Sequence, residues 1–398
     1  MGRWVKTGFD SVVCDDTHSG TKVPAVEYMR SGVCSIIDQG QDFIAGYSDD
    51  MAAAYRNLPA IVFGDHTRVL KFVDFPFLLG ADGAKILRPA TDKLDCKFLF
   101  YYLLQHPVPS TGYNRHYSWM RRMQVEYPAP LDEQRHIAEI LTTCDEVIEK
   151  SESVVDKYRA IKAGMLKDLF TRGIGKNGKL RPPPESAPQL YKDTTLGKVP
   201  REWEIKNLGE IGRFVAGNGF PLQYQGRKDG QYPFFKVSDF NGWANTNVMS
   251  IANHYVSDDV VRILGCNVIP ARSIVFAKIG AAIMLERKRM VAVESCIDNN
   301  MMSLQVDGAN DSLVLHFLQN YKFSDLVEAT ALPALKTTSL KKICLAIPRD
   351  PAEQRQIAER LSAIDAKIAD ELAVIAKYRK VKAGLMARLL TPPDMEVE

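Results

Sequence analysis

The sequence lacks the spacing patterns of cysteine and histidine that mark disulfide frameworks and metal sites. Its seven histidines show no H-x-x-x-H spacing, and its seven cysteines contain no C-x-x-C pair. An odd number of scattered cysteines is typical of free, buried thiols in a reducing compartment. We therefore expect neither a disulfide framework nor a bound metal.

Catalytic motifs are missing as well. The chain contains no P-loop, no G-x-S-x-G and no H-E-x-x-H, which argues against the nucleotide-hydrolysing, serine-hydrolase and zinc-protease classes. It also lacks the Asn/Asp-Pro-Pro-Tyr/Phe motif that a methyltransferase active site would need. We expect a chain that performs no chemistry of its own.

Long hydrophobic runs are also absent. The most apolar stretch, Ile263–Leu285, is interrupted by Pro270, Arg272 and Lys278, whereas a membrane helix needs about 20 apolar residues. The opening Met1–Trp4 lacks the apolar run of a signal peptide. These features predict a cytoplasmic protein.

Composition and charge limit the class of protein further. A length of 398 residues predicts two to four structural units, and 46% hydrophobic with 25% charged residues is typical of a folded chain. The net charge is +3. Such a small excess does not predict nonspecific coating of DNA, but it allows local basic patches.

A long internal repeat is the main feature that the sequence does contain. Residues 133–171 match residues 353–391 at a constant offset of 220, with 18 of 39 positions identical. Apolar residues recur in both copies at steps of three and four, which predicts helices over 130–172 and 350–391. Each helix would be about 60 Å long. Because each apolar seam needs a cover, we predict that the two helices pack together, through Ile137, Leu141, Ile148, Tyr158, Ile357, Leu361, Ile368 and Tyr378.

The start of the second helix carries a recognisable capping signal. Asp350 is placed as the N-cap, Pro351 as the first helical residue and Glu353 as the partner that completes a capping box. The first copy has Pro130 where the second has Asp350. That helix therefore starts without the box.

The segments before the helices repeat more loosely. Residues Trp4–Phe9 resemble Trp203–Leu208, and short β-branched and aromatic runs later in each segment also correspond, namely Cys34–Ile37 with Pro233–Phe235, Ile61–Phe63 with Ile274–Phe276, and Leu99–Gln105 with Leu313–Gln319. These runs predict two related α/β (α+β) domains of short strands and a few helices.

The predicted order of the chain follows from these repeats. It comprises a first domain (1–129), a helix (130–172), a linker (173–200), a second domain (201–349), a helix (350–391) and a tail (392–398). The proline-rich Arg181–Pro188 predicts an extended linker without a fold of its own.

This order and its motifs resemble the specificity subunits of type I restriction–modification systems, over nearly the whole chain. The phrase Thr195–Trp203 is similar to the start of a target recognition domain, and Ala271–Gly280 followed by Asn299-Asn300 matches a pattern common in such domains. The runs Pro128–Arg135 and Pro348–Arg355 are similar to the start of the family's conserved helix. The first domain departs from the pattern, because it lacks the Leu-Gly-Lys-Val-Pro phrase.

The resemblance implies a fold and a function. Two target recognition domains would each read one half of a split DNA sequence. The conserved helices would form an antiparallel coiled coil with pseudo-twofold symmetry, which spaces the domains and docks two modification (methyltransferase) subunits. Those subunits, and not this chain, would hold S-adenosylmethionine and methylate adenine. The resemblance also allows for a restriction (endonuclease) subunit in the complex.

Two glycines in the repeated helices suggest a further packing hypothesis. Gly164 and Gly384 occupy matching places where glycine costs about 1 kcal/mol relative to alanine. In a fully overlapped antiparallel pair, Gly164 would lie near Ser362 and Gly384 near Thr142, which would allow close backbone approach. The alternative is a local break in each helix.

Candidate contact residues follow from the chemistry of base edges, which are read by Arg, Lys, Asn, Gln and short polar side chains. In the first domain the candidates are Asp38, Gln39, Gln41, Tyr47, His66, Arg68, Asn114, Arg115 and Tyr117. In the second domain they are Lys236, Ser238, Asp239, Lys278, Arg287, Lys288 and Lys336. Any one of them could instead be a solvated surface residue or contact phosphate.

The helix-start triplets form a second group of candidates. Two roles remain open for them: docking of the methyltransferase subunits, or capping and bracing of a recognition domain against its helix. The residues are Glu133, Gln134, Arg135, Glu353, Gln354 and Arg355.

Two other functions also remain open. The chain could be a scaffold that binds proteins rather than DNA, or a fused methyltransferase–specificity protein. The missing catalytic motif argues against the second. Steep salt dependence and sequence preference in DNA binding would argue against the first.

Overall fold

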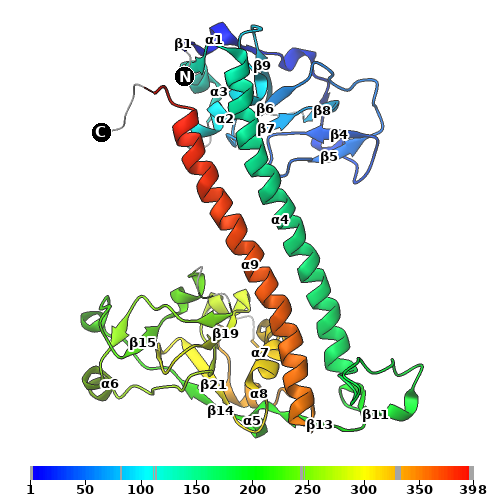
Figure 1. Cartoon of the computed structure of the whole chain (residues 1–398), viewed down its shortest axis with the longest axis vertical. Helices are drawn as coiled ribbons and strands as arrows, with labels where there is room; N and C mark the ends of the chain where they lie inside the picture. The colour runs from blue at the N-terminus through cyan, green and yellow to red at the C-terminus, as the bar shows by residue number, and fades with distance from the viewer. Residues whose placement is uncertain are drawn as a thin grey trace. The chain divides into compact units, whose positions relative to one another are not determined.

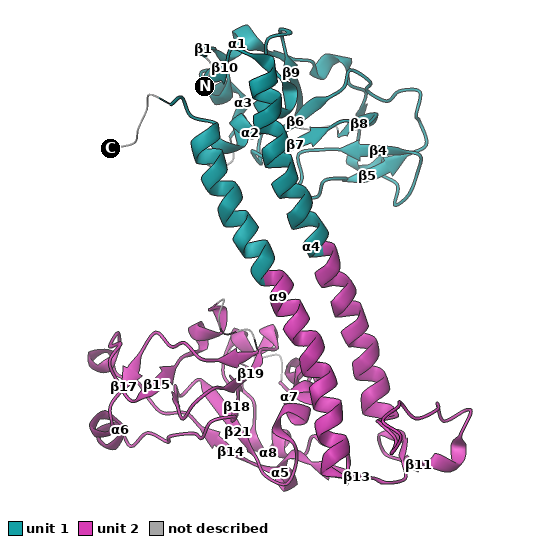
Figure 2. Cartoon of the chain, viewed as in Figure 1, with its two compact units in different colours: residues 1–152, 373–398 teal, residues 153–372 magenta. Residues whose placement is uncertain are grey.

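The chain divides into two units, each of which combines one globular domain with part of both long helices (Figure 2). Unit 1 contains residues 1–152 and 373–398, and unit 2 contains residues 153–372. The computed structural model describes residues 3–80, 83–110, 112, 114–242, 245, 247–327 and 333–393. The predicted tail therefore lies outside the described residues from 394 onward.

The described residues of the globular part of unit 1 form three small sheets. Their strand orders are β1-β10, β2-β9-β6-β7 and β3-β8-β4-β5 (Figure 1). The elements are β1 (Trp4–Gly8), α1 (Phe9–Val12), β2 (Val13–Asp15), β3 (Lys22–Val23), β4 (Cys34–Ile37), β5 (Gly46–Ser48), β6 (Ala60–Gly64), β7 (Leu70–Val73), β8 (Phe77–Gly80), β9 (Ala84–Pro89), α2 (Cys96–Gln105), α3 (Tyr117–Met120) and β10 (Gln124–Pro128).

The globular part of unit 2 has a matching set of sheets and one additional hairpin. Their strand orders are β13-β22, β14-β21-β18-β19-β16, β17-β15-β20 and β11-β12. The elements are β11 (Tyr191–Thr194), β12 (Gly197–Pro200), β13 (Trp203–Asn207), α5 (Leu208–Ile211), β14 (Gly212–Ala216), β15 (Tyr232–Phe235), β16 (Val248–Met249), β17 (Tyr255–Val256), α6 (Asp258–Leu264), β18 (Ile274–Ala277), β19 (Lys288–Val291), β20 (Cys296–Ile297), β21 (Met301–Val306), α7 (Asp311–Asn320), α8 (Thr337–Lys341) and β22 (Cys344–Pro348).

The two domains share one topology, as the loose sequence repeat predicted. Trp4 lies opposite Pro128 in the β1–β10 pair, and Trp203 lies opposite Pro348 in the β13–β22 pair. The sheet β2-β9-β6-β7 corresponds to β14-β21-β18-β19. In addition, β4 runs parallel to β8 as β15 runs parallel to β20.

One part of the predicted correspondence was wrong by a single residue. The sequence alignment paired Leu99 with Leu313, but the caps of the two helices set a different register. The Asp95 side chain accepts from Phe98 N at 2.9 Å, and the Asn310 side chain accepts from Leu313 N at 2.9 Å. Helices α2 and α7 therefore align at an offset of 215. A run of apolar residues in both helices hides such a shift, because several registers match equally well.

The long helices form as predicted. Helix α4 spans Leu131–Thr171 (41 residues) and α9 spans Pro351–Leu389 (39 residues), each unbroken (Figure 1). Ala352 N donates to Asp350 Oδ1 at 2.8 Å, which satisfies one of the free amides at the start of α9. The predicted capping box is wrong in its second half, because the Glu353 carboxylate is used elsewhere.

Within each unit, the two helices run antiparallel. In unit 1, Lys382 contacts Asp145 and Arg379 contacts Glu152. In unit 2, Lys162 contacts Asp365, and Leu169 shares a core cluster with Ile357. In both units, residue numbers rise along α4 as they fall along α9, as the predicted antiparallel pair requires.

Most of the predicted packing residues are buried. Ile137, Leu141, Ile148, Ile357 and Leu361 are buried, whereas Tyr158, Ile368 and Tyr378 are half-buried. The seam also packs against the recognition domains. Ile137 and Leu141 share a core with Phe98 and Leu99 of α2, and Leu361 shares one with Leu313 of α7.

The glycine hypothesis is wrong in both of its forms. Gly164 and Gly384 are exposed, a Cβ built on either would meet nothing within 4 Å, and both helices continue through them. The predicted register was nearly right: a pairing of Gly164 with Ser362 would set Lys162 opposite Ile364, and Lys162 contacts the next residue, Asp365. Both glycines instead lie on the solvent side of their helices.

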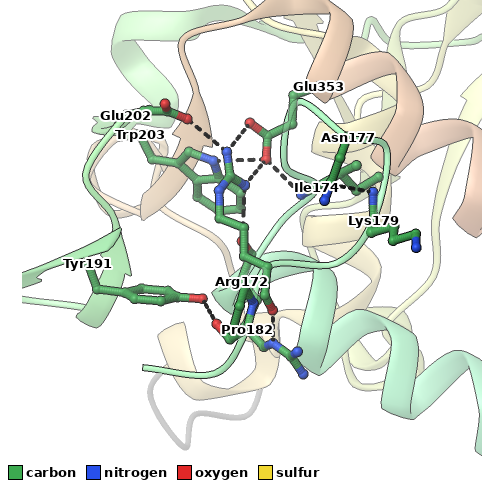
Figure 3. Close-up of polar contacts among 10 residues, drawn as sticks. Arg172, Ile174, Asn177, Lys179, Pro182, Tyr191, Glu202, Trp203 and Glu353 are labelled. Carbon is green, nitrogen blue, oxygen red and sulfur yellow. Dashed lines mark hydrogen bonds and ion pairs between the residues drawn. The ribbon is translucent and has the colours of Figure 1, made fainter. Parts of the chain in front are cut away.

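The predicted linker (173–200) contains regular structure on both sides of the proline-rich stretch Arg181–Pro188. Strands β11 and β12 form an antiparallel hairpin, and Ile174 forms a bridge with Leu180. Two polar contacts attach the segment. Arg181 donates to Glu353 at 2.5 and 3.0 Å, and Tyr191 OH donates to Pro182 O at 2.6 Å (Figure 3). Buried polar contacts thus hold in place a segment for which the proline content predicted no fold of its own.

The cysteines follow the expected pattern in part. All seven are free. Four are buried, Cys14 and Cys266 are half-buried, and Cys344 is exposed. Among the described residues, no helix has the length and apolar content needed to cross a membrane.

Candidate nucleic-acid interface

Three loops of the first domain come together at one place. They are the loop after β4 (Asp38–Gln41), the turn between β6 and β7 (Asp65–Arg68) and the segment before α3 (Asn114–His116). His66 N donates to Gln39 Oε1 at 3.3 Å. His116 N donates to Asp65 O at 2.9 Å, which attaches the third loop to the second. The structure therefore unites candidates that lie far apart in the sequence.

The second domain builds the same cluster from corresponding segments. These are the loop after β15 (Lys236–Asn241), the connection between β18 and β19 (Lys278–Arg287) and the segment before α8 (Leu335–Lys336). Leu335 N donates to Lys278 O at 2.9 Å, as His116 N does to Asp65 O. The Arg287 guanidinium donates to Asn241 Oδ1 at 2.5 Å, which attaches the second loop to the first.

The exposure of the candidate residues in and around these clusters varies. The exposed ones are Gln41, Arg68, Asn114, Arg115, Ser238 and Lys336, and the half-buried ones are Asp38, Gln39, Tyr47, His66, Tyr117, Lys236, Lys278 and Arg287. Two candidates are buried. The clusters as a whole present polar and basic side chains that suit base edges and phosphates.

The prediction that Asp239 contacts DNA is wrong, because its side chain is 2% exposed and binds its own loop. Its carboxylate accepts from Lys236 N at 2.7 Å and from Asn253 Nδ2 at 2.7 Å. Asp239 therefore shapes the loop after β15 from within.

Lys288 was also a wrong candidate. Its side chain is buried, donates to Tyr321 O at 2.8 Å and pairs with the Glu286 carboxylate. Its ammonium lies 4.4 Å from the centre of the Phe323 ring. Lys288 lies between Arg287 and Arg289 in the sequence, and three adjacent cations suggested a surface patch. In the structure, Lys288 is the first residue of β19 and its side chain points inward.

Two tyrosine candidates, Tyr47 and Tyr117, contribute to strand pairing and ring packing within the first domain. Tyr47 lies on β5, where its backbone pairs with Met29, outside the three-loop cluster. The Tyr117 ring packs against Phe9 at 6.4 Å and lies under Lys85. Burial raises the pKa of Tyr117 to about 12.

The two glutamines of the helix-start triplets brace the domains. Gln134 accepts from Asp95 N and donates to Pro128 O, each at 2.8 Å. Gln354 accepts from Asn310 N and donates to Pro348 O, each at 2.7 Å. Both side chains are buried, at 0% and 6% exposure. The predicted docking role is therefore wrong for Gln134 and Gln354, whose hydrogen bonds join a helix to its own domain.

Glu353 is likewise committed inside the chain. Its carboxylate accepts from Arg181, from Ile174 N at 2.8 Å and from Trp203 Nε1 at 3.2 Å (Figure 3). The side chain is 8% exposed, so its docking role is wrong too. Glu133 is half-buried, and Arg135 and Arg355 are exposed. For Glu133, Arg135 and Arg355, docking of a partner subunit remains a prediction.

The sequence analysis missed a second brace between each domain and its helices. In unit 1, Tyr101 OH donates to Asp145 Oδ2 at 2.8 Å and lies 3.1 Å from Thr142 Oγ1. In unit 2, His316 Nε2 lies 3.1 Å from Ser362 Oγ, and His316 Nδ1 lies 3.6 Å from Asp365 Oδ2. The identity of Asp145 and Asp365 in the repeat was the available signal.

The Ser362–His316–Asp365 arrangement resembles a catalytic triad, but its counterpart argues for bracing. At the offset of 215, Tyr101 occupies the position of His316, and a phenol that donates to a carboxylate is no general base for a hydroxyl. Burial lowers the pKa of His316 below its ordinary value, and the nearby Asp365 opposes that effect. Among the described residues, no three His, Cys, Asp or Glu side chains gather as a metal site.

Comparison with known proteins accounts for this architecture. Residues 200–376 match the family model for the type I restriction modification DNA specificity domain. The second domain and most of α9 are therefore similar to the DNA specificity domain of type I restriction–modification systems.

Individual relatives agree with this assignment. The chain is 23% identical over 335 residues to the putative type I restriction enzyme MjaX specificity subunit of Methanocaldococcus jannaschii, covering 79% of this chain and 72% of that one. It is 24% identical over 260 residues to the EcoR124I/EcoR124II specificity subunit of Escherichia coli, covering 63% and 58%. The chain thus matches between about three fifths and three quarters of the length of these two proteins.

A solved structure supports the fold. The crystal structure of a type I restriction–modification S subunit from M. genitalium aligns with a TM-score of 0.67 at 15% identity, covering 98% of this chain and 96% of the other. At such low identity the likeness concerns the fold alone. It includes both domains of the specificity subunit and both long helices.

Proposed function

We propose that this specificity subunit reads a bipartite DNA target, with each recognition domain contacting one half-site. The observation that carries the proposal is the equivalence of the two loop clusters. The same three loops, joined by the same backbone bond, occur in both domains with different side chains. Asp65, His66 and Arg68 in the first correspond to Lys278–Arg287 in the second. Different side chains on one scaffold favour half-sites of different sequence.

The helix pair would set the distance between the half-sites. Each helix is unbroken and about 60 Å long, which corresponds to roughly 17 base pairs at about 3.4 Å each. Antiparallel pairing within each unit supports this role, because a helix cannot change length without breaking its hydrogen bonds. The pseudo-twofold relation of the whole molecule belongs to the same proposal.

The repeated helices would also dock two modification subunits. Ile161 and Val381 are related by the 220-residue offset, and both are exposed, at 50% and 43%. Gly164 and Gly384 follow one turn later and are also exposed. Repeated apolar exposure supports two copies of one partner. Glu133, Arg135 and Arg355 remain candidates for this interface.

The division of chemistry completes the proposal. The modification subunits would hold S-adenosylmethionine and methylate adenine, and a restriction subunit would join where unmodified DNA is cleaved. This chain would bind no cofactor itself. The complex would work in the cytoplasm on the host genome and on incoming DNA.

Variants in the two loop clusters test the proposal. The chain is combined with its modification subunits, and binding to DNA is measured as a function of salt alongside mapping of methylated adenines in the host. Arg68→Ala with Arg115→Ala should weaken recognition of one half-site, and Lys278→Ala with Lys336→Ala that of the other. Each lost base contact should cost about 1–3 kcal/mol.

An exposed lysine far from either cluster in the sequence supplies the control. Lys198 lies on the hairpin strand β12, and Lys198→Ala should leave both half-sites unchanged. Binding without sequence preference or steep salt dependence would show a protein-binding scaffold instead. Unchanged methylation sites after deletion of the gene would also contradict the proposal.

A further inference from the structure

Two cations occupy the same strand position in the two recognition domains. Lys71 lies opposite Val62 in the β6–β7 pair, and Arg289 lies opposite Val275 in the β18–β19 pair. Val62 and Val275 are equivalent in the sequence repeat. Lys71 and Arg289 are therefore equivalent as well, although the sequences of β7 and β19 show no clear similarity.

Lys71 is buried and directed at the loop after β4. Its side chain is 3% exposed. The ammonium donates to Asp38 O at 2.9 Å and to Asp42 O at 2.5 Å, and lies 3.6 Å from Asp38 Oδ1. Among the described residues, the polar partners of this ammonium, Asp38 and Asp42, both belong to that loop.

Arg289 makes the corresponding contact in the second domain. Its guanidinium donates to Phe240 O at 3.4 Å and lies 5.9 Å from the centre of the Phe240 ring. Asp42 is the fifth residue after β4, and Phe240 is the fifth residue after β15. The two cations thus contact the equivalent carbonyl of the equivalent loop.

A buried cation is expensive unless hydrogen bonds replace its lost hydration. Two loop carbonyls supply those bonds to Lys71. Arg289 is half-buried and donates to one loop carbonyl, Phe240 O. Each cation therefore contributes to the conformation of its loop. The loop after β4 carries Gln41, which is exposed, and Gln39, which contacts the next loop of the cluster. The conformation of this loop therefore determines the positions of Gln39 and Gln41.

We propose that Lys71 and Arg289 are positioning residues for base recognition: each fixes the reading loop of its domain without contacting DNA. This inference rests on the proposed function, in which those loops read the half-sites. It explains why the residue opposite Val62 in one domain and opposite Val275 in the other is a cation. It also predicts that each residue affects one half-site and not the other.

The test uses the full chain with its modification subunits. Affinity is measured for the intact bipartite duplex and for duplexes with one half-site replaced, as a function of salt. Lys71→Met should lower discrimination at the first domain's half-site by about tenfold, leave the other half-site unchanged and leave the salt dependence unchanged. Arg289→Met should show the reverse pattern. The conservative exchanges Lys71→Arg and Arg289→Lys should retain most of the discrimination.

The unaffected half-site shows in each variant that the chain is folded. A reduction of the salt slope by about one charge would overturn the inference, because it would show a direct phosphate contact. Equal loss at both half-sites, or unchanged discrimination, would overturn it as well. If the unaltered complex itself shows no sequence preference, the proposed function fails, which is a separate result.

Discussion

Lys162 of α4 donates to Asp365 of α9 at 2.6 Å. The equivalent residues of the repeat form the same pair with the helices exchanged: Lys382 of α9 donates to Asp145 of α4 at 2.5 Å. Each acid also contacts its recognition domain, through His316 in one unit and Tyr101 in the other. One carboxylate therefore joins both helices and a domain. The repeat conserves this junction while the domains around it differ.

Removal of one partner from the junction should destabilise unit 2. Lys162 and Asp365 have side chains that are 18% and 10% exposed, so Lys162→Met would leave a largely buried carboxylate without its cation. We expect a loss of about 3 kcal/mol in the free energy of unfolding, measured by thermal or denaturant unfolding. The double variant Lys162→Met with Asp365→Leu should recover part of that loss.

An exposed ion pair on the same helix provides the matched control. Asp156 and Arg159 are 75% and 60% exposed and lie 3.1 Å apart, so Arg159→Met should change stability by less than about 0.5 kcal/mol. Equal effects of the two substitutions would contradict the importance of the Lys162–Asp365 pair.

Replacement of the helix glycines should stabilise the chain. Gly164→Ala and Gly384→Ala each place a Cβ where no atom lies within 4 Å. Each should add about 1 kcal/mol of helix stability, seen as a higher unfolding temperature. A lower temperature would show that the glycines are not free of contacts. A higher temperature combined with failure to bind modification subunits would place the glycines in the docking surface.

Loss of the Arg181 side chain should release the hairpin that precedes the second domain. Arg181→Met removes the cation that pairs with the buried Glu353, which keeps its bonds from Ile174 N and Trp203 Nε1. We expect a cost of about 3 kcal/mol and faster proteolysis within residues 172–200. Arg201→Met serves as the control, because Arg201 is exposed and donates to a backbone carbonyl. Equal proteolysis of both variants would argue against the buried pair as the anchor.

His316 should make unit 2 less stable in acid. Burial holds the pKa of His316 below its ordinary value, so the folded state binds this proton less readily than the unfolded state. Its contribution to stability is complete above about pH 6.5 and is lost as the pH falls below that value. Unfolding temperatures at about pH 7.5 and about pH 5.5 should therefore differ more for the natural chain than for His316→Gln.

A second histidine shows whether this effect is specific. His136 has a side chain that is 73% exposed on α4, so His136→Gln should leave the pH dependence as it is. If His316→Gln also leaves it unchanged, His316 is not the group whose protonation lowers the stability in acid.

Much of this architecture could be predicted from the sequence because it depends on local periodicity. The 39-residue repeat predicted both helices and their buried faces, and the looser repeat before the helices predicted the equivalence of Trp4 with Trp203. The register of α2 against α7 could not be predicted, since their apolar runs match at neighbouring offsets and the caps Asp95 and Asn310 decide between them.

The candidate site was predicted less completely. The sequence indicated polar loops that the structure brings together in each domain, because polar residues follow buried strands in both. It could not separate exposed side chains such as Arg115 from buried ones such as Lys288 and Asp239, since burial depends on what packs against a residue. It left docking, capping and bracing open for Glu353 and could not show that Arg181, 172 residues earlier, pairs with it in a buried site.

The sequence alone determined the duplicated order of domain and helix, because a helical period and a repeat offset can be read from neighbouring residues. The tertiary structure decided which polar groups face water and which hold the chain together. Gln134, Gln354, Glu353 and Lys71 are ordinary polar residues in the sequence. Their roles follow from carbonyls, amides and charges that only folding brings within hydrogen-bonding distance.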